Sequence, residues 1–90
     1  MSGFDQATRS EIAHRSRGNC EARLRYCFGR ATHIHHRQLR AQGGPDTVDN
    51  GLHVCAPCHK RIHEESGMHD RGLLVHAWDD PAAVPIVRTF

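Results

Sequence analysis

Four cysteines in two pairs constrain the fold of this 90-residue chain more than any other feature. A chain of this length buries only about 60 % of its unfolded surface, so its core needs support from a disulfide, a metal or a partner. Only 38 % of the residues are hydrophobic, which agrees with a thin core. Six residues separate Cys20 from Cys27, and two residues separate Cys55 from Cys58. We therefore predict that the cysteines form the support.

The second pair has the spacing of a zinc knuckle, whereas the first pair is wider than usual. The N-terminal residues contain no apolar targeting segment, so we expect a cytosolic protein, in which paired thiols bind zinc more often than they form disulfides. A disulfide stays open as an alternative. Cys55-Ala-Pro-Cys58-His59 also matches the c-type haem attachment motif, but that chemistry requires export and leaves Cys20 and Cys27 unexplained. We predict a structural Zn²⁺ held by four thiolates.

Local patterns predict one small α+β domain over residues 1–90, with a core at about 17–65, an N-terminal helix within 1–17 and a C-terminal extension over 68–90. Thr8-Arg9-Ser10-Glu11 fits a capping box and Gly18 a C-cap, and Pro57 suits the first turn of a helix. The expected elements are a helix at 5–17, strands at 31–36 and 51–55, a long loop at 37–50 with a turn at 43–46, a helix from 57 to about 65, and a candidate third strand at 73–75.

Histidines cluster around the long loop. His59 and His63 lie four residues apart on the predicted second helix, so both project from one face and can share a metal ion. His35, at the end of the preceding strand, can supply a third imidazole. Nine histidines are present, so one such pair carries little weight alone. Its occurrence together with His36 and Asn50 indicates a metal site.

These residues carry a family resemblance. His35-His36, a Gly-Gly pair at 43–44, Asn50, and the run Cys55-x2-Cys58-His59-x3-His63 resemble the HNH endonuclease motif over about residues 17–65. The cysteine pairs resemble those of the zinc-bearing phage and prophage-type branch. The resemblance implies a ββα-metal (His-Me finger) core that carries the four-cysteine zinc site and follows the N-terminal helix.

The resemblance also implies roles for individual residues. His36 would be the general base that takes a proton from the attacking water, and Asn50 would keep the base or the metal oriented. His35, His59 and His63 would hold one divalent metal ion. Many family members have Asp where this chain has His35. A carboxylate favours Mg²⁺, whereas three imidazoles favour Zn²⁺, Ni²⁺, Mn²⁺ or Co²⁺, so the identity of the catalytic ion stays open.

Arginine is concentrated in the N-terminal part of the chain. Residues 1–40 contain eight arginines and three acidic residues, and residues 41–90 contain four basic and seven acidic residues. Arginine also outnumbers lysine eleven to one. A GC-rich genome explains the preference for arginine, and the other reading is an N-terminal half that faces phosphate, because Arg matches phosphate oxygens with two parallel donors. The candidates for the scissile phosphate are Arg37 and Arg40. The candidates for other DNA contacts are Arg15, Arg17, Arg23, Arg25, Lys60 and Arg61.

We therefore expect a metal-dependent DNA endonuclease in the cytoplasm of a bacterial host cell. Two alternatives are a non-catalytic, zinc-stabilised nucleic-acid-binding module and a structural zinc domain that recruits a protein, such as part of a phage packaging complex. No segment approaches the ~20 apolar residues of a membrane span. Whether the partner besides DNA is a second copy of the chain or a packaging protein stays open, as does nicking against double-strand cutting.

Overall fold

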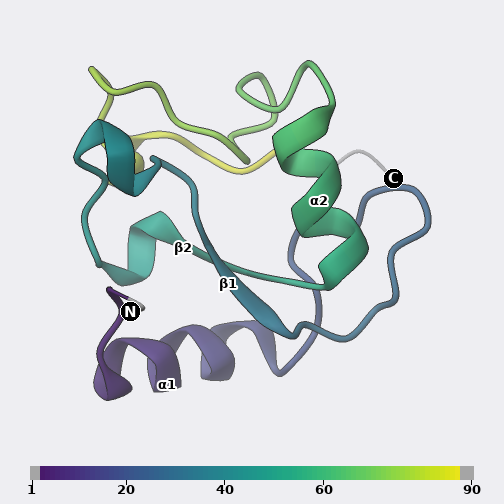
Figure 1. Ribbon diagram of the computed structural model, residues 1–90. Coiled ribbons are helices and arrows are strands. Elements are labelled where there is room, and N and C mark those ends of the chain that lie inside the picture. Colours follow the sequence, from purple (N-terminus) through teal and green to yellow (C-terminus); the bar gives the residue numbers. More distant parts are fainter. Residues whose placement is uncertain (1–2, 88–90) are drawn as a thin grey trace.

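The computed structural model of the protein describes residues 3–87. A two-stranded sheet lies between two helices, with α1 along one side and α2 on the other (Figure 1). The helices and strands are α1 (Gln6–Ser16), β1 (His33–His36), β2 (Gly51–Val54) and α2 (Ala56–Glu64), with short 3-10 helices η1 (Arg40–Gln42), η2 (Val48–Asn50) and η3 (Pro81–Ala83). The prediction of a small α+β fold is confirmed, and each of the four main elements lies within two residues of its expected bounds.

The two strands are antiparallel, and their register places functional residues at one end of the sheet. His35 pairs with Leu52 and His36 pairs with Gly51. Side chains alternate across a strand, so His35 faces the α2 side of the sheet while His36 faces the other. Gly51 allows α1 to pack closely, because a Cβ at this position would lie 2.3 Å from Cδ1 of Ile12.

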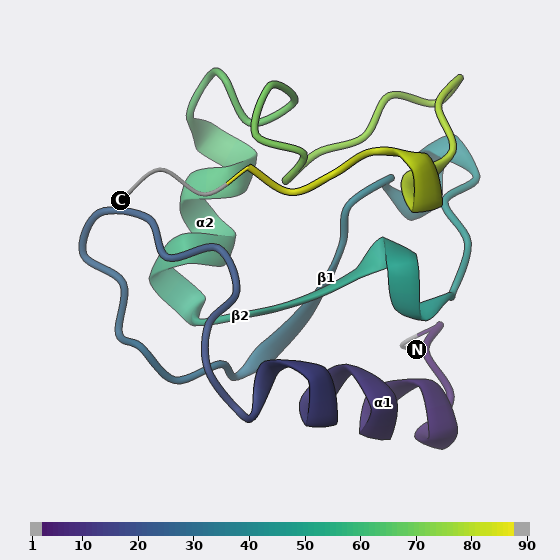
Figure 2. The ribbon, with the colours of Figure 1, turned by 180° about the vertical axis from the view of Figure 1, so that it is seen from behind.

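The expected third strand is wrong: within residues 3–87 the sheet has two strands. Leu73 and Val75 are buried, as the apolar pattern suggested, but their backbone takes a different course. The amide of Leu73 donates to the carbonyl of Met68 at 3.0 Å, and that of Val75 donates to Arg37 at 2.8 Å. These bonds form a turn beside the end of β1, and they do not form the hydrogen-bond ladder of a third strand. The C-terminal segment then crosses the back of the molecule (Figure 2).

The caps of α1 also differ from the prediction. Asp5 is the N-cap, and its side chain accepts a hydrogen bond from the amide of Thr8 at 2.8 Å. The predicted capping box at Thr8 is therefore wrong, because the helix already begins at Gln6. Arg17 ends the helix in a left-handed conformation with φ 56°, directly before the expected Gly18. In the part of the chain described, no helix has both the length and the apolar character that crossing a membrane requires.

The core is small and includes the cysteines. Leu52 and Val54 of β2, Ile62 of α2 and Leu73 of the C-terminal extension are all fully or almost fully buried, and the four cysteines pack against them. Since the sulfur cluster occupies a large part of this interior, its state affects the stability of the whole domain.

Candidate metal and catalytic site

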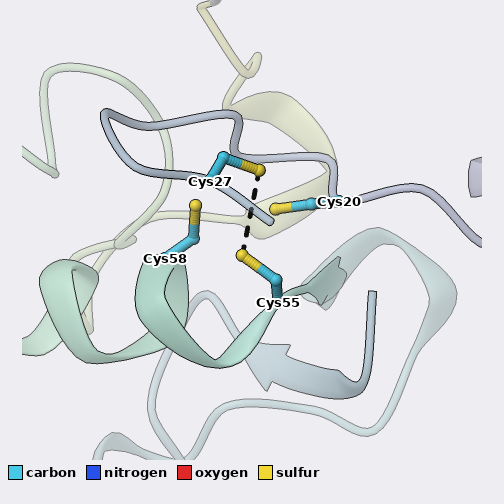
Figure 3. Close-up of side chains that lie close together, drawn as sticks. All are labelled: Cys20, Cys27, Cys55 and Cys58. Carbon is cyan, nitrogen blue, oxygen red and sulfur yellow. Dashed lines mark hydrogen bonds between the residues drawn. The ribbon is translucent and has the colours of Figure 1, made fainter. Parts of the chain in front are cut away.

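The four cysteine sulfur atoms converge at one point (Figure 3). Cys20 and Cys27 lie on the loop between α1 and β1, and Cys55 and Cys58 lie at the start of α2. All four Sγ atoms are within 4.8 Å of one another, and those of Cys27 and Cys55 are 3.8 Å apart. Four thiolates around a tetrahedral Zn²⁺ at 2.3 Å would lie about 3.8 Å apart. The cysteines are free thiols, and their donor set and spacing fit a zinc site.

Backbone amides surround the sulfur atoms. The amides of Leu24, Phe28 and Gly29 donate to Cys58, Cys55 and Cys27 at 3.4, 3.5 and 3.2 Å. The loop reaches this geometry through left-handed residues, with φ 49° at Arg23 and φ 65° at Tyr26. Burial raises the pKa of the Cys27 and Cys58 thiols, and the amide donors act in the opposite direction because they favour the charged form. A bound cation would complete the stabilisation of thiolate ligands here.

A second cluster consists of three imidazoles. His35 of β1 and His59 and His63 of α2 each offer one nitrogen, and these nitrogens lie within 4.8 Å of one another. The Nε2 atoms of His59 and His63 are 3.3 Å apart. Two imidazole ligands of a tetrahedral ion at 2.0–2.1 Å would lie about 3.3 Å apart. The predicted trio is thus brought together, and its spacing fits one metal ion.

His35 is oriented by a residue that sequence reasoning missed. Its side chain is buried, and its Nε2 lies 2.9 Å from the carbonyl oxygen of Leu73. Donation from Nε2–H to this carbonyl leaves Nδ1 as the ligand atom, an arrangement common at metal-bound histidines. Burial lowers the pKa of His35 to about 3, so the imidazole is neutral and able to bind metal at physiological pH.

His36 lies on the other face of β1 and contacts an acid. Its Nε2 lies 2.7 Å from Oδ1 of Asp46, and its ring stacks on Phe4 with centroids 4.2 Å apart. Gly3 leaves the space for Asp46, because a Cβ on Gly3 would lie 2.2 Å from the same Oδ1. The sequence indicated only a turn at Asp46. Its placement next to His36 depends on how the long loop folds back, which no local pattern encodes.

Asn50 connects the two ends of the long loop. Its Oδ1 accepts from the amide of Gln38 at 2.7 Å, and its Nδ2 donates to the carbonyls of Gln38 at 3.0 Å and Pro45 at 2.9 Å. The residue is fully buried. It thereby fixes the segment after His36 against the segment before Asp46, and its printed side-chain bonds go to the loop rather than to the imidazole.

The three-imidazole cluster and His36 border one hollow of about 230 Å³. Its walls include the three imidazoles of the cluster, His36 and the side chain of Arg40. A group bound at the imidazole cluster therefore lies next to a separate imidazole that is oriented by a carboxylate. This arrangement suits metal-assisted hydrolysis, which combines an electrophilic ion with a base for water.

The profile of the HNH endonuclease family matches residues 18–65, which is more than half of the chain. The chain belongs to the HNH endonuclease family. No curated protein matches it. The matched segment runs from the first cysteine pair through both strands to the end of α2, so it contains both clusters. The match does not distinguish the phage-type branch that the cysteine pairs suggested.

Arg37, which the sequence suggested as a ligand of the scissile phosphate, is buried and bonded within the fold. Only 3 % of the residue is exposed. Its guanidinium donates to the carbonyls of Gly72 at 2.7 Å, Asp49 at 2.8 Å and Pro81 at 3.1 Å, and also to that of Val84. The side chain therefore joins the long loop to the C-terminal extension, and it uses four of its five N–H donors there.

Arg15 also differs from its expected role. Its guanidinium forms two hydrogen bonds with Glu21, at 2.8 and 2.6 Å, and donates to the carbonyls of Val48 and Gly51. These bonds connect α1 to the loop and to β2, so the side chain has a structural role, and its contact with DNA stays a prediction.

The remaining candidates lie on different faces of the molecule. Arg40 borders the hollow at His36. Arg25 and Arg61 line another hollow, and Arg61 pairs there with Glu65. Because Arg61 is two residues from both His59 and His63, it projects from the opposite side of α2. Arg17, Arg23 and Lys60 are exposed.

Proposed function

We propose that this HNH endonuclease hydrolyses phosphodiester bonds of DNA, with His36 as the general base and one divalent metal ion at His35, His59 and His63. The observation that carries the proposal is the shared hollow, which is bordered both by the three-imidazole cluster and by the Asp46-oriented His36. A structural Zn²⁺ at the four cysteines is part of the same proposal.

His36 is suited to accept a proton. The carboxylate of Asp46 accepts a hydrogen bond from Nε2–H, which fixes the ring orientation and leaves Nδ1 as the basic nitrogen. The carboxylate also stabilises the imidazolium that forms when Nδ1 takes a proton from water, as in other carboxylate–imidazole pairs. Phe4 limits the movement of the ring by stacking on it. His36 thus holds the proton that leaves the attacking water.

The three-imidazole cluster is suited to hold a metal ion near the scissile phosphate. A bound divalent ion supplies charge stabilisation at a phosphate oxygen and at the leaving 3′ oxygen. Three neutral nitrogen donors favour Zn²⁺, Ni²⁺, Mn²⁺ or Co²⁺ over Mg²⁺. His35 contributes rigidity, since it is buried and bonded to Leu73, whereas His63 is exposed at the surface.

Arg40 and Asn50 have supporting roles in this proposal. Arg40 borders the hollow and brings positive charge to the place where the phosphate would lie. Asn50 is a positioning residue, because it fixes the loop that carries Asp46. Arg17, Arg23, Arg25, Lys60 and Arg61 stay candidates for contacts to the DNA backbone, which would position the protein without reading sequence.

A non-catalytic nucleic-acid-binding module is the alternative. Such a module has no need of an imidazole held by a carboxylate beside a second, non-cysteine ligand cluster. The pairing of His36 with Asp46 therefore favours an enzyme. With one ion per chain, each encounter would cut one strand, so nicked circles should precede linear DNA.

Cleavage of supercoiled plasmid by the zinc-loaded protein, with Mg²⁺, Mn²⁺, Ni²⁺, Co²⁺ or Zn²⁺ added in turn, tests the proposal. We expect nicking that is lost in His59→Ala, while the fold and the thiolate zinc persist. The products should carry 5′-phosphate and 3′-hydroxyl ends. A folded, DNA-binding protein that cuts with none of the five ions would contradict the proposal and favour the binding module.

A further inference from the structure

A second hollow, of about 450 Å³, adjoins the first. Ile34 and His59 line both, so the two hollows meet at a member of the three-imidazole cluster. We call the two adjoining hollows together the active-site groove. Arg40 lines the first hollow with His36, and Arg9 lines the second.

The second hollow is lined by donors and contains no acid. Arg9 comes from α1, His33 from β1 and His53 from β2. Thr32 directly precedes β1. No Asp or Glu is among its lining residues. The hollow on the opposite side of α2 is different, because Glu65 lies there among the arginines. A polyanion that enters the second hollow therefore meets no carboxylate among the lining residues.

His33 is a fourth imidazole beside the metal cluster. Its ring centroid is 5.5 Å from that of His59, and it lies on the same face of β1 as His35. Even so, the converging ligand atoms belong to His35, His59 and His63. His33 is exposed and lines the second hollow together with Arg9.

Ala13 leaves room for a ligand between these groups. It lies four residues after Arg9 and hence on the same face of α1, where it forms part of the wall of the groove. A methyl group at this position keeps the space between α1 and β1 open. The surface next to the metal cluster thus combines a guanidinium, an imidazole and free volume.

We propose that Arg9 and His33 form a second phosphate subsite, which holds a DNA phosphate that flanks the scissile one. The inference rests on the proposed function, since it gives the course of the substrate strand beyond the metal cluster. A guanidinium donates two parallel hydrogen bonds to a phosphate, and the N–H of an imidazole adds a third. The strand would run along the groove from Arg40, past His59, to Arg9.

Equilibrium binding of a short fluorescent DNA duplex in the His36→Ala background, across a salt series, tests the subsite. Arg9→Ala should weaken binding about tenfold at low salt, as expected for the loss of a charged hydrogen bond. It should also reduce the slope of log Kd against log salt by about one. Arg30→Ala is the matched control, because Arg30 is exposed, lines neither part of the groove and is not among the candidates for DNA contacts, so its loss should change neither quantity.

A second pair of variants tests the groove itself. Ala13→Glu places a carboxylate in the groove, within reach of Arg9, and should weaken binding at least as much as Arg9→Ala. His14→Glu adds the same charge to the same helix outside the lining residues and should have a smaller effect. Circular dichroism and the melting temperature report whether each variant folds.

The outcomes separate this inference from the proposed function. If the protein with intact His36 nicks plasmid and Arg9→Ala and Ala13→Glu bind like their controls, the subsite is wrong and the nuclease stands. If Arg9→Ala shows the reduced salt slope but no ion supports nicking, the subsite is supported as a DNA contact and the catalytic proposal fails.

Discussion

The Nε2 atom of His36 lies 2.7 Å from Oδ1 of Asp46, across ten residues of sequence. The pair joins the end of β1 to the turn of the long loop. It gives the proposed base a fixed orientation before any substrate is bound, because a neutral imidazole that donates from one nitrogen keeps the other as an acceptor.

Asp46→Asn should lower kcat and leave KM nearly unchanged, since the side chain orients His36 without lining the hollow. We expect a loss of about 10- to 100-fold, as for other carboxylates that orient functional imidazoles. Steady-state nicking assays measure both constants. Asp70→Asn, which removes an exposed acid after α2, is the control and should behave like the unmodified protein. Equal kcat values for the two variants would contradict the proposal that Asp46 orients His36 for catalysis.

Cys58→Ser should destabilise the entire domain. The sulfur is fully buried within the cluster, and zinc binding at such a site contributes directly to folding. The melting temperature and the zinc content per chain should both fall. His59→Ala, at the next position, should keep the thiolate zinc and most of the stability, because it belongs to the other cluster. A normal melting curve for Cys58→Ser would argue against structural zinc.

Asn50→Ala should cost about 3 kcal/mol of unfolding free energy, because it leaves the amide of Gln38 and two carbonyls without their partner in a buried place. Asn50→Asp is a sharper test. It keeps the size of the side chain but replaces the Nδ2 donor with an oxygen that faces the carbonyls of Gln38 and Pro45. Chemical denaturation should show that both variants are destabilised. An unchanged unfolding free energy for Asn50→Asp would contradict the role of Asn50 in fixing the loop.

Arg37→Met should lower stability by about 3 kcal/mol or more, because four carbonyls lose their donor in the interior. Thermal or chemical unfolding measures this loss. If Arg37 held the scissile phosphate, the same variant would instead retain stability and lose DNA affinity. That outcome would support the role in phosphate binding that the sequence suggested, and it would contradict the role of Arg37 in joining the loop to the C-terminal extension.

The sequence predicted the elements whose signals are local. The spacing of His59 and His63, the proline in the first turn of α2 and the cysteine pairs each reflect a neighbourhood of a few residues, and the structure brings both ligand sets together. The family resemblance was confirmed by the match over residues 18–65. The capping box at Thr8 was wrong because Asp5 competes for the same amide and lies earlier in the chain.

What the sequence did not reveal depends on long-range folding. Leu73 supports His35 from 38 residues away, and Asp46 reaches His36 only because the loop closes on Asn50. For the same reason Arg37 and Arg15 resembled phosphate ligands in the sequence. Nothing local distinguishes an arginine that faces DNA from one whose donors are satisfied by the backbone of distant segments.

The rate of single-turnover DNA cleavage by His36→Ala, compared with that of the unmodified protein, tests the central claim most directly. The account predicts a fall of about 10²- to 10⁴-fold, the usual contribution of a general base, with unchanged metal content at both clusters and unchanged DNA affinity. Cleavage by His36→Ala at the rate of the unmodified protein would contradict the assignment of His36 as the base.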